Sequence, residues 1–276
     1  MFASATLRRL IVPIAPLALV ALAACSDSSS SNAAPVALSF ATRSEAITTA
    51  PANGATVGAG TTIIVGGTDT LRLTSVRLVI DELELLRTTS GTCTGDSGHD
   101  SGADDSGHHA AGTSGDCFAF ESGPYLVELP LDGNVSSAIS VAIPSGSYSK
   151  LEMKLRQADS GEDRAFNSAH AEMNGITVLA SGTYRGQPFT WRGNVEASLE
   201  MHFPQAMVVD GAGNITVSID VGGWFRTGTG AIIDPATAGE GQANFATVAQ
   251  NIRASFGAFE DDDHDGRDDH GGRNDD

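Results

Sequence analysis

The chain has very little positive charge. Lys150 and Lys154 are its only lysines, and its 16 lysines and arginines are outnumbered by 34 aspartates and glutamates, which gives a formal net charge of −18. A surface this acidic repels nucleic acid and anionic lipid headgroups, and it favours solubility and the binding of cations. We therefore expect no nucleic-acid partner.

The signatures of several enzyme classes are also missing. The sequence has no phosphate-binding glycine loop in the right context, no C-x-x-C and no H-E-x-x-H motif. The run from Cys93 to Gly98 (Cys-Thr-Gly-Asp-Ser-Gly) resembles the nucleophile motif of trypsin-like proteases. However, His99 and Asp100 stand where that family has glycine and proline, and no histidine precedes His99 to act as the base. We expect the chain not to be an enzyme.

Cysteine is scarce, and the first of the three has a distinctive setting. Leu22-Ala23-Ala24-Cys25 ends an apolar stretch that follows Arg8 and Arg9 and is too short to span a bilayer comfortably. This pattern is typical of a lipobox, in which Cys25 carries the lipid; the alternative is an ordinary signal peptide with a chance cysteine. We expect a signal peptide over 1–24 and a lipidated, serine-rich tether over 25–35.

The lipobox pattern also predicts where the protein is located. Ser26 follows the cysteine, and no aspartate stands there, which resembles lipoproteins sorted to the outer membrane. The predicted location is the bacterial cell envelope, on the periplasmic face or the cell surface of the outer membrane, with the membrane as partner through the N-terminal lipid.

The two remaining cysteines flank a segment without an apolar period. Cys93 and Cys117 are expected to form a disulfide in an oxidising compartment, at the base of a flexible insertion over 91–117. The insertion carries His99, His108 and His109 among several aspartates, a mixture that suits zinc, nickel or copper(II). Their spacing matches no zinc signature, so a flexible surface loop is the alternative.

The rest of the chain is patterned as strands. Apolar residues alternate with polar ones over 71–85, 195–203 and 215–221, and glycine and asparagine mark the turns. The phase of the first stretch slips near Ser75 and again near 81–82, where bulges or tight turns are expected. We predict an all-β fold, an antiparallel β-sandwich or partly closed barrel over 36–259, with Trp191 and Trp224 in its core.

Helical spacing occurs near the C-terminus. Phe245, Val248, Ala249 and Ile252 fall on one face, with Phe256 and Phe259 in the same phase, which predicts an amphipathic helix over 242–258. The segment 260–276 has no apolar residue and is predicted to be a disordered acidic tail.

The acidic tail also contains a calcium-binding pattern. Asp261, Asp263, Asp265 and Asp269, with Gly266, match the D-x-D-x-D-G-x-x-D part of a calcium loop, in which alternate carboxylates turn inward. Gly272 stands where an EF-hand has its bidentate glutamate, so the predicted Ca²⁺ affinity is weak. A solvating tail without metal, or a transition metal bound through His264 and His270, are the alternatives.

Several segments resemble a known group of proteins. They include Gly123-Pro-Tyr-Leu-Val-Glu-Leu-Pro-Leu-Asp132, Ile143-Pro-Ser-Gly-Ser-Tyr148 and Asn214-Ile-Thr-Val-Ser-Ile-Asp-Val-Gly-Gly-Trp-Phe225, together with 71–86 and 251–259. They are similar to a group of uncharacterised bacterial lipoproteins with a transthyretin-like β-sandwich domain of unknown function. The resemblance covers most of 60–265 and implies a fold and a compartment, but no catalytic residue.

The sequence thus favours a lipid-anchored envelope protein that binds or interacts without catalysis. An envelope protein or a polysaccharide is the expected class of partner. The first alternative is an envelope metal-binding protein that uses the aspartate tail or the histidine loop. The second is an envelope hydrolase, which a polar pocket with a carboxylate pair of raised pKa would favour.

Overall fold

The described residues build two β-sheets. The computed structural model describes residues 33–43, 53–58, 60–88, 117–120 and 124–269, all within one compact unit, Ser31–Asp276. The smaller sheet has the order β13 (Phe256–Glu260), β12 (Gly213–Asp220), β1 (Ala33–Arg43), β7 (Val135–Pro144). β1 runs parallel to β12, and the other two pairings are antiparallel.

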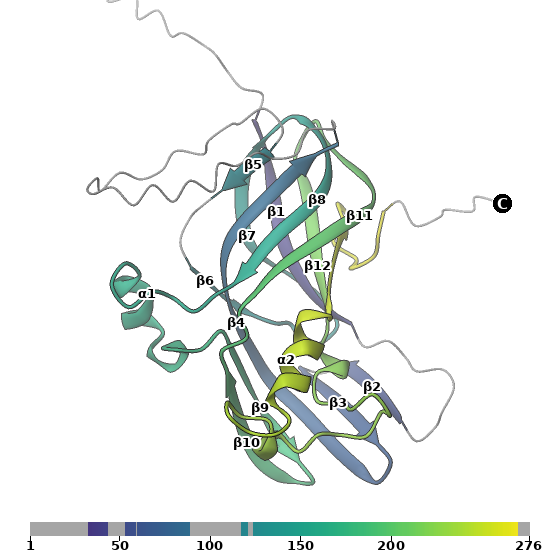
Figure 1. Cartoon of the computed structure of the whole chain (residues 1–276). Helices are drawn as coiled ribbons and strands as arrows, with labels where there is room; N and C mark the ends of the chain where they lie inside the picture. The colour runs from purple at the N-terminus through teal and green to yellow at the C-terminus, as the bar shows by residue number, and fades with distance from the viewer. Residues whose placement is uncertain (1–32, 44–52, 59, 89–116, 121–123, 270–276) are drawn as a thin grey trace, which may run out of the picture. The chain divides into compact units, whose positions relative to one another are not determined.

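The larger sheet is assembled around one long strand, β4 (Asp69–Arg87) (Figure 1). Near its start, β4 lies between β9 and β3. The strand order there is β10 (Gln187–Gly193), β9 (Val178–Tyr184), β4, β3 (Thr61–Gly66), β2 (Asn53–Gly58). Toward its end, β4 pairs with β5 (Cys117–Phe120), β6 (Tyr125–Glu128) and β8 (Gly146–Leu155), and β8 pairs with β11 (Ala197–Val209). The all-β prediction is confirmed, and the two sheets are not closed into a barrel.

The two predicted slips of phase in β4 are confirmed. Its register against β9 shifts between Leu73 and Ser75, and its register against β8 shifts between Ile80 and Leu83. At the first shift the backbones of β4 and β9 lie very close together. A Cβ atom at Gly182 would be only 1.8 Å from the backbone oxygen of Arg72. Glycine in β9 therefore makes room for the bulge that keeps the apolar side chains of β4 on the core side.

One hydrophobic core contains side chains of both sheets. The predicted core tryptophans are confirmed, with Trp191 2% and Trp224 0% exposed. Trp191, on β10, meets Phe225 edge-on at 5.6 Å and donates its Nε1–H to the backbone oxygen of Ala238 at 2.7 Å. These contacts fasten the region of η2 (Val221–Gly223), η3 (Pro235–Thr237) and α2 (Phe245–Arg253) to the larger sheet.

A second, small cluster forms where β4 meets a segment without regular strands. Val79, Met173 and Ile176 are buried together, and Phe166 packs against them from α1 (Arg164–Ala169), which precedes η1 (Ala171–Met173). The sequence analysis predicted neither α1 nor β2.

The predicted helix over 242–258 is wrong in length. Only Phe245–Arg253 is helical, with Val248, Ala249 and Ile252 buried, and the chain then turns and enters β13. Phe256 pairs with Ile219 and Phe259 with Thr216 in the antiparallel register of β12. Backbone pairing with a strand far away in the sequence therefore overrides the helical spacing of these two phenylalanines.

Both predicted domain limits also change. Residues 33–35, predicted as tether, already belong to β1, where Ala34 pairs with Ile143. At the other end, Asp261 is fully buried and residues 260–269 make backbone and side-chain hydrogen bonds to the sheet and within the loop. The first ten residues of the predicted disordered tail are therefore part of the domain.

A candidate cation site in the loop after the last strand

A buried chain of polar groups leads through the smaller sheet to Asp261. Ser39 Oγ donates to Asn214 Oδ1 at 2.6 Å, Asn214 Nδ2 donates to Thr216 Oγ1 at 3.0 Å, and Thr216 Oγ1 donates to Asp261 Oδ2 at 2.6 Å. All four residues are at most 1% exposed. Buried polar groups need such partners, so the network fixes each member in one orientation.

The backbone continues the same connection beyond β13. Asp261 N donates to Asn214 O at 3.0 Å, and Asn214 Nδ2 donates to Asp261 O at 2.8 Å. Asp262 Oδ1 accepts from Asn214 N at 2.9 Å. The loop therefore starts from a residue whose backbone and side chain are both held by β12.

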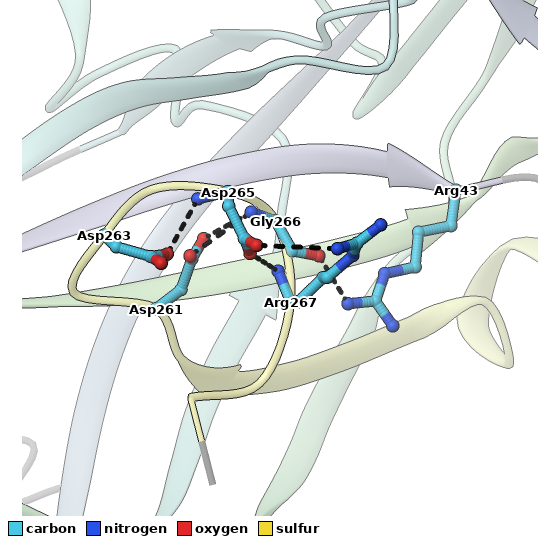
Figure 2. A network of polar contacts seen from close by, with 6 residues as sticks. All are labelled: Arg43, Asp261, Asp263, Asp265, Gly266 and Arg267. Carbon is cyan, nitrogen blue, oxygen red and sulfur yellow. Dashed lines mark hydrogen bonds and ion pairs between the residues drawn. The ribbon is translucent and has the colours of Figure 1, made fainter. Parts of the chain in front are cut away.

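Three of the predicted ligands come together in this loop. One carboxylate oxygen from each of Asp261, Asp263 and Asp265 lies within 4.8 Å of the others, and Figure 2 shows the three side chains on the inner side of the loop. Within the described part of the chain, no other group of three or more histidine, cysteine, aspartate or glutamate side chains meets this condition.

Turn geometry produces this convergence. Gly266 N donates to both carboxylate oxygens of Asp261 at 3.2 Å, and Asp265 N donates to Asp263 Oδ1 at 3.1 Å. Gly266 has φ +77°, a conformation that favours glycine, and it occupies the sixth position counted from Asp261. Calcium loops place an invariant glycine at this position for the sharp turn.

The fourth predicted ligand, Asp269, lies outside this group of three. Asp269 Oδ2 accepts from Asp262 N at 2.6 Å, and Asp269 N donates to Glu260 O at 3.1 Å. Asp269 therefore closes the loop by hydrogen bonds, whereas the spacing of the motif predicted it as a ligand alongside the other three aspartates.

Little positive charge balances the three carboxylates. Among the described residues, the ion pair that reaches them joins Arg267 Nη1 to Asp265 Oδ2 at 3.9 Å, and the Arg267 side chain is 85% exposed. Arg43 donates to the backbone oxygen of Gly266 at 2.6 Å (Figure 2). Two like charges about 4 Å apart repel each other by about 1 kcal/mol in water and by about 4 kcal/mol near a protein surface. A divalent cation bound between the carboxylates would attract all of them and so offset this repulsion.

Most of the other predicted site residues lie outside the described residues. These are Cys25, Cys93, His99, His108 and His109. Cys117 begins β5, but nothing is described of its side chain. Lipidation, the disulfide between Cys93 and Cys117 and the histidine metal site therefore stay predictions.

A row of acidic side chains crosses the larger sheet and is not predicted by the sequence pattern. Glu84 on β4 lies directly opposite Glu152 on β8, which lies directly opposite Glu200 on β11. Like charges in such positions are destabilising. Alternation shows which side chains leave the core, but it does not show which strands become neighbours.

Both lysines of the chain lie on β8, on either side of Glu152. Lys150 pairs with Glu152 and, at 3.3 Å, with Glu200, and Lys154 pairs with Glu82. Burial raises the pKa of Glu84 to about 6, helped by the hydrogen bond with Glu82 and by the charges of Glu82 and Glu152.

A carboxyl pair with a raised pKa is the feature that would favour a hydrolase. The cavity beside Glu82 and Glu84 has a volume of only about 60 Å³. Substrate pockets usually measure about 300–1,000 Å³. The pair is therefore better explained by charge balance on the sheet than by catalysis.

Comparison of this chain with known proteins finds no match. No family model matches the chain, and neither a curated protein nor a solved structure gives a significant match. Within the described residues, the helices fall short of the length and apolarity that a membrane span requires.

The first prediction tests the buried network. Thr216→Val keeps the shape of the side chain but removes the hydroxyl that serves Asn214 and Asp261. Because both groups are buried, we expect the free energy of unfolding to fall by about 1–3 kcal/mol. Urea unfolding measures the change, with Thr56→Val on the exposed side of β2 as the control. Equal stability of the two variants would contradict the assigned network.

The second prediction concerns pH. The folded protein holds the Glu84 proton more tightly than the unfolded chain, so this stabilisation is fully present below the unfolded pKa of about 4.5 and is lost as pH rises through about 6. The shift corresponds to about 2 kcal/mol, which solvent screening at this half-buried site reduces to about 1 kcal/mol.

Glu84→Gln removes this pH dependence. Relative to the wild type, we expect the variant to gain about 1 kcal/mol of stability between pH 4.5 and pH 8, measured by urea unfolding at both values. Glu162→Gln, at an exposed position outside the sheets, controls for the loss of one charge. A stability difference between Glu84→Gln and the wild type that is the same at both pH values would refute the assignment.

Proposed function

We propose that this protein is a non-enzymatic binding module of the bacterial cell envelope, a β-sandwich tethered through a lipid on Cys25, whose C-terminal loop binds Ca²⁺. The convergence of Asp261, Asp263 and Asp265 is the observation that carries the calcium assignment. The lipobox pattern supports the tether, and the paired sheets around one core support the sandwich.

Calcium fits the loop better than a transition metal does. The three converging side chains offer only oxygen ligands, which hard cations prefer, and imidazole or thiolate would be expected for zinc or copper. His264 lies in the same loop, but its Nδ1 is 3.0 Å from the backbone oxygen of Asp262 and is engaged there. In a calcium loop, position seven adds a backbone oxygen, here that of Arg267, and water completes the shell.

The site is partly built before the cation arrives. Asp261 is held by Thr216 and by the sheet, so its ordering costs nothing further when Ca²⁺ binds. Asp263 and Asp265 are exposed and lack the bidentate glutamate of an EF-hand. The expected dissociation constant is therefore in the range of weak extracellular modules, about 10⁻⁴–10⁻³ M.

The calcium assignment is tested by calorimetry and unfolding on the full chain after treatment with a chelator. We expect one Ca²⁺ per chain and, at ten times the dissociation constant, a stabilisation of about 1.4 kcal/mol. The double variant Asp263→Asn, Asp265→Asn is expected to lose both effects because it removes two of the three charges.

The matched control is Asp268→Asn, which removes one charge from the same loop at a position that does not provide a ligand in calcium loops. We expect it to keep Ca²⁺ binding within a factor of about two. If Mg²⁺ or extra NaCl stabilises the protein as much as Ca²⁺ does, or if Asp268→Asn loses binding as fully as the double variant, the assignment fails.

The tether has its own test. When the chain is expressed in a bacterium that exports lipoproteins, labelled palmitate should be incorporated, and Cys25→Ala should abolish the label because the acceptor thiol is gone. Cys117→Ala serves as the control and should leave labelling unchanged. Undiminished labelling of Cys25→Ala would rule out this anchor.

A further inference from the structure

A second candidate site lies at the tip of the hairpin formed by β9 and β10, which is well separated in sequence from the aspartate loop. A cavity of about 490 Å³ opens between this hairpin and residues 234–236. This volume falls within the range of ligand pockets in proteins. Half-buried Tyr184 and Phe189 supply aromatic rings to its wall, and Arg185, Gln187 and Asp234 supply polar groups.

The rings are held firmly. Phe189 packs edge-on against buried Phe225, with ring centroids 6.0 Å apart. Tyr184 Oη donates to Asp69 Oδ2 at 3.2 Å. Neither ring needs to be ordered by a ligand, so little conformational entropy is lost on binding.

The polar groups of the hairpin are also fixed in advance. Arg185 donates through Nε and Nη2 to the two oxygens of Asp69, both at 2.8 Å. Asp234 lies close enough for its charge to act on both Tyr184 and Arg185. The guanidinium of Arg185, the carboxylate of Asp234 and the phenol of Tyr184 therefore line the cavity, and Asp69 holds the first and the third in place.

The backbone at Arg185 is strained. Arg185 has φ +50° and Gly186 has φ +79°, the two positive values of a tight hairpin turn in which asparagine or glycine is preferred at the first position. Such strain persists where the surroundings or the function require the side chain. The bidentate pair with Asp69 holds this conformation and keeps the Arg185 guanidinium at the cavity wall.

The mixture of groups selects the chemistry of the ligand. An anion would meet Asp234, a cation would meet Arg185, and a purely apolar ligand would strip water from both charges. A sugar ring avoids these costs, because its hydroxyl groups donate to the carboxylate and accept from the guanidinium while its C–H face packs on an aromatic ring. We propose that this cavity binds a neutral saccharide.

The test uses the full chain and three neutral disaccharides, cellobiose, maltose and N,N′-diacetylchitobiose, in saturation-transfer difference NMR followed by titration. At least one should give a saturable signal, also in the presence of EDTA because the aspartate loop takes no part. Phe189→Ala should weaken that binding at least about tenfold, the size of the loss of one well-packed aromatic contact.

Two further variants keep the proposal falsifiable if Phe189→Ala does not fold. Arg185→Gly relieves the backbone strain and should fold, yet lose binding by a similar factor. Thr183→Ala, one residue before Tyr184 and on the opposite face of β9, is the control and should bind within about twofold of wild type.

Three outcomes would overturn the proposal. They are the absence of a saturable signal from all three disaccharides, unchanged affinity in both Phe189→Ala and Arg185→Gly, and stronger competition by glucosamine or glucuronate than by glucose. The last result would show that the site selects a charged ligand.

Discussion

Backbone pairing along β4 is the constraint on which the rest of the structure depends. This strand of 19 residues pairs with β3, β5, β6, β8 and β9, so one register error would move side chains in most of the larger sheet from the core to solvent. Its bulges absorb the mismatch between a long twisted strand and several partners. The close approach of Gly182 to Arg72 shows how tightly the first bulge is built.

Much of this architecture could be predicted from local pattern. Alternation in β4, β11 and β12 predicted strands and core, and the slips near Ser75 and at 81–82 predicted the bulges. The helix over 242–258 was predicted too long because Phe256 and Phe259 fit either a helix or a strand, and only β12 decides between them. The burial of Asp261 could not be predicted, since Thr216, its hydrogen-bond partner, lies 45 residues earlier. The aspartate spacing predicted that Asp261, Asp263 and Asp265 come together, but it did not predict that Asp269 hydrogen-bonds to Asp262 outside this group.

The acidic residues of the protein form two clusters that differ in the positive charge around them. On the larger sheet, Lys150 pairs with Glu152 and Glu200 of the acidic row, Lys154 pairs with Glu82, and burial raises the pKa of Glu84. In the C-terminal loop, three carboxylates converge, and exposed Arg267 makes an ion pair with one of them at 3.9 Å. The first cluster contains its own cations, whereas the second has little positive charge beside it.

The parallel pairing of β1 with β12 joins distant parts of the chain, and Ser39 and Asn214, which are hydrogen-bonded across it, are 175 residues apart. The smaller sheet therefore cannot be completed until β12 and β13, which come late in the sequence, are available to pair. Contacts this distant in sequence slow folding. A chain with this topology stays partly open until its late strands are available, and the domain becomes rigid only when they have paired.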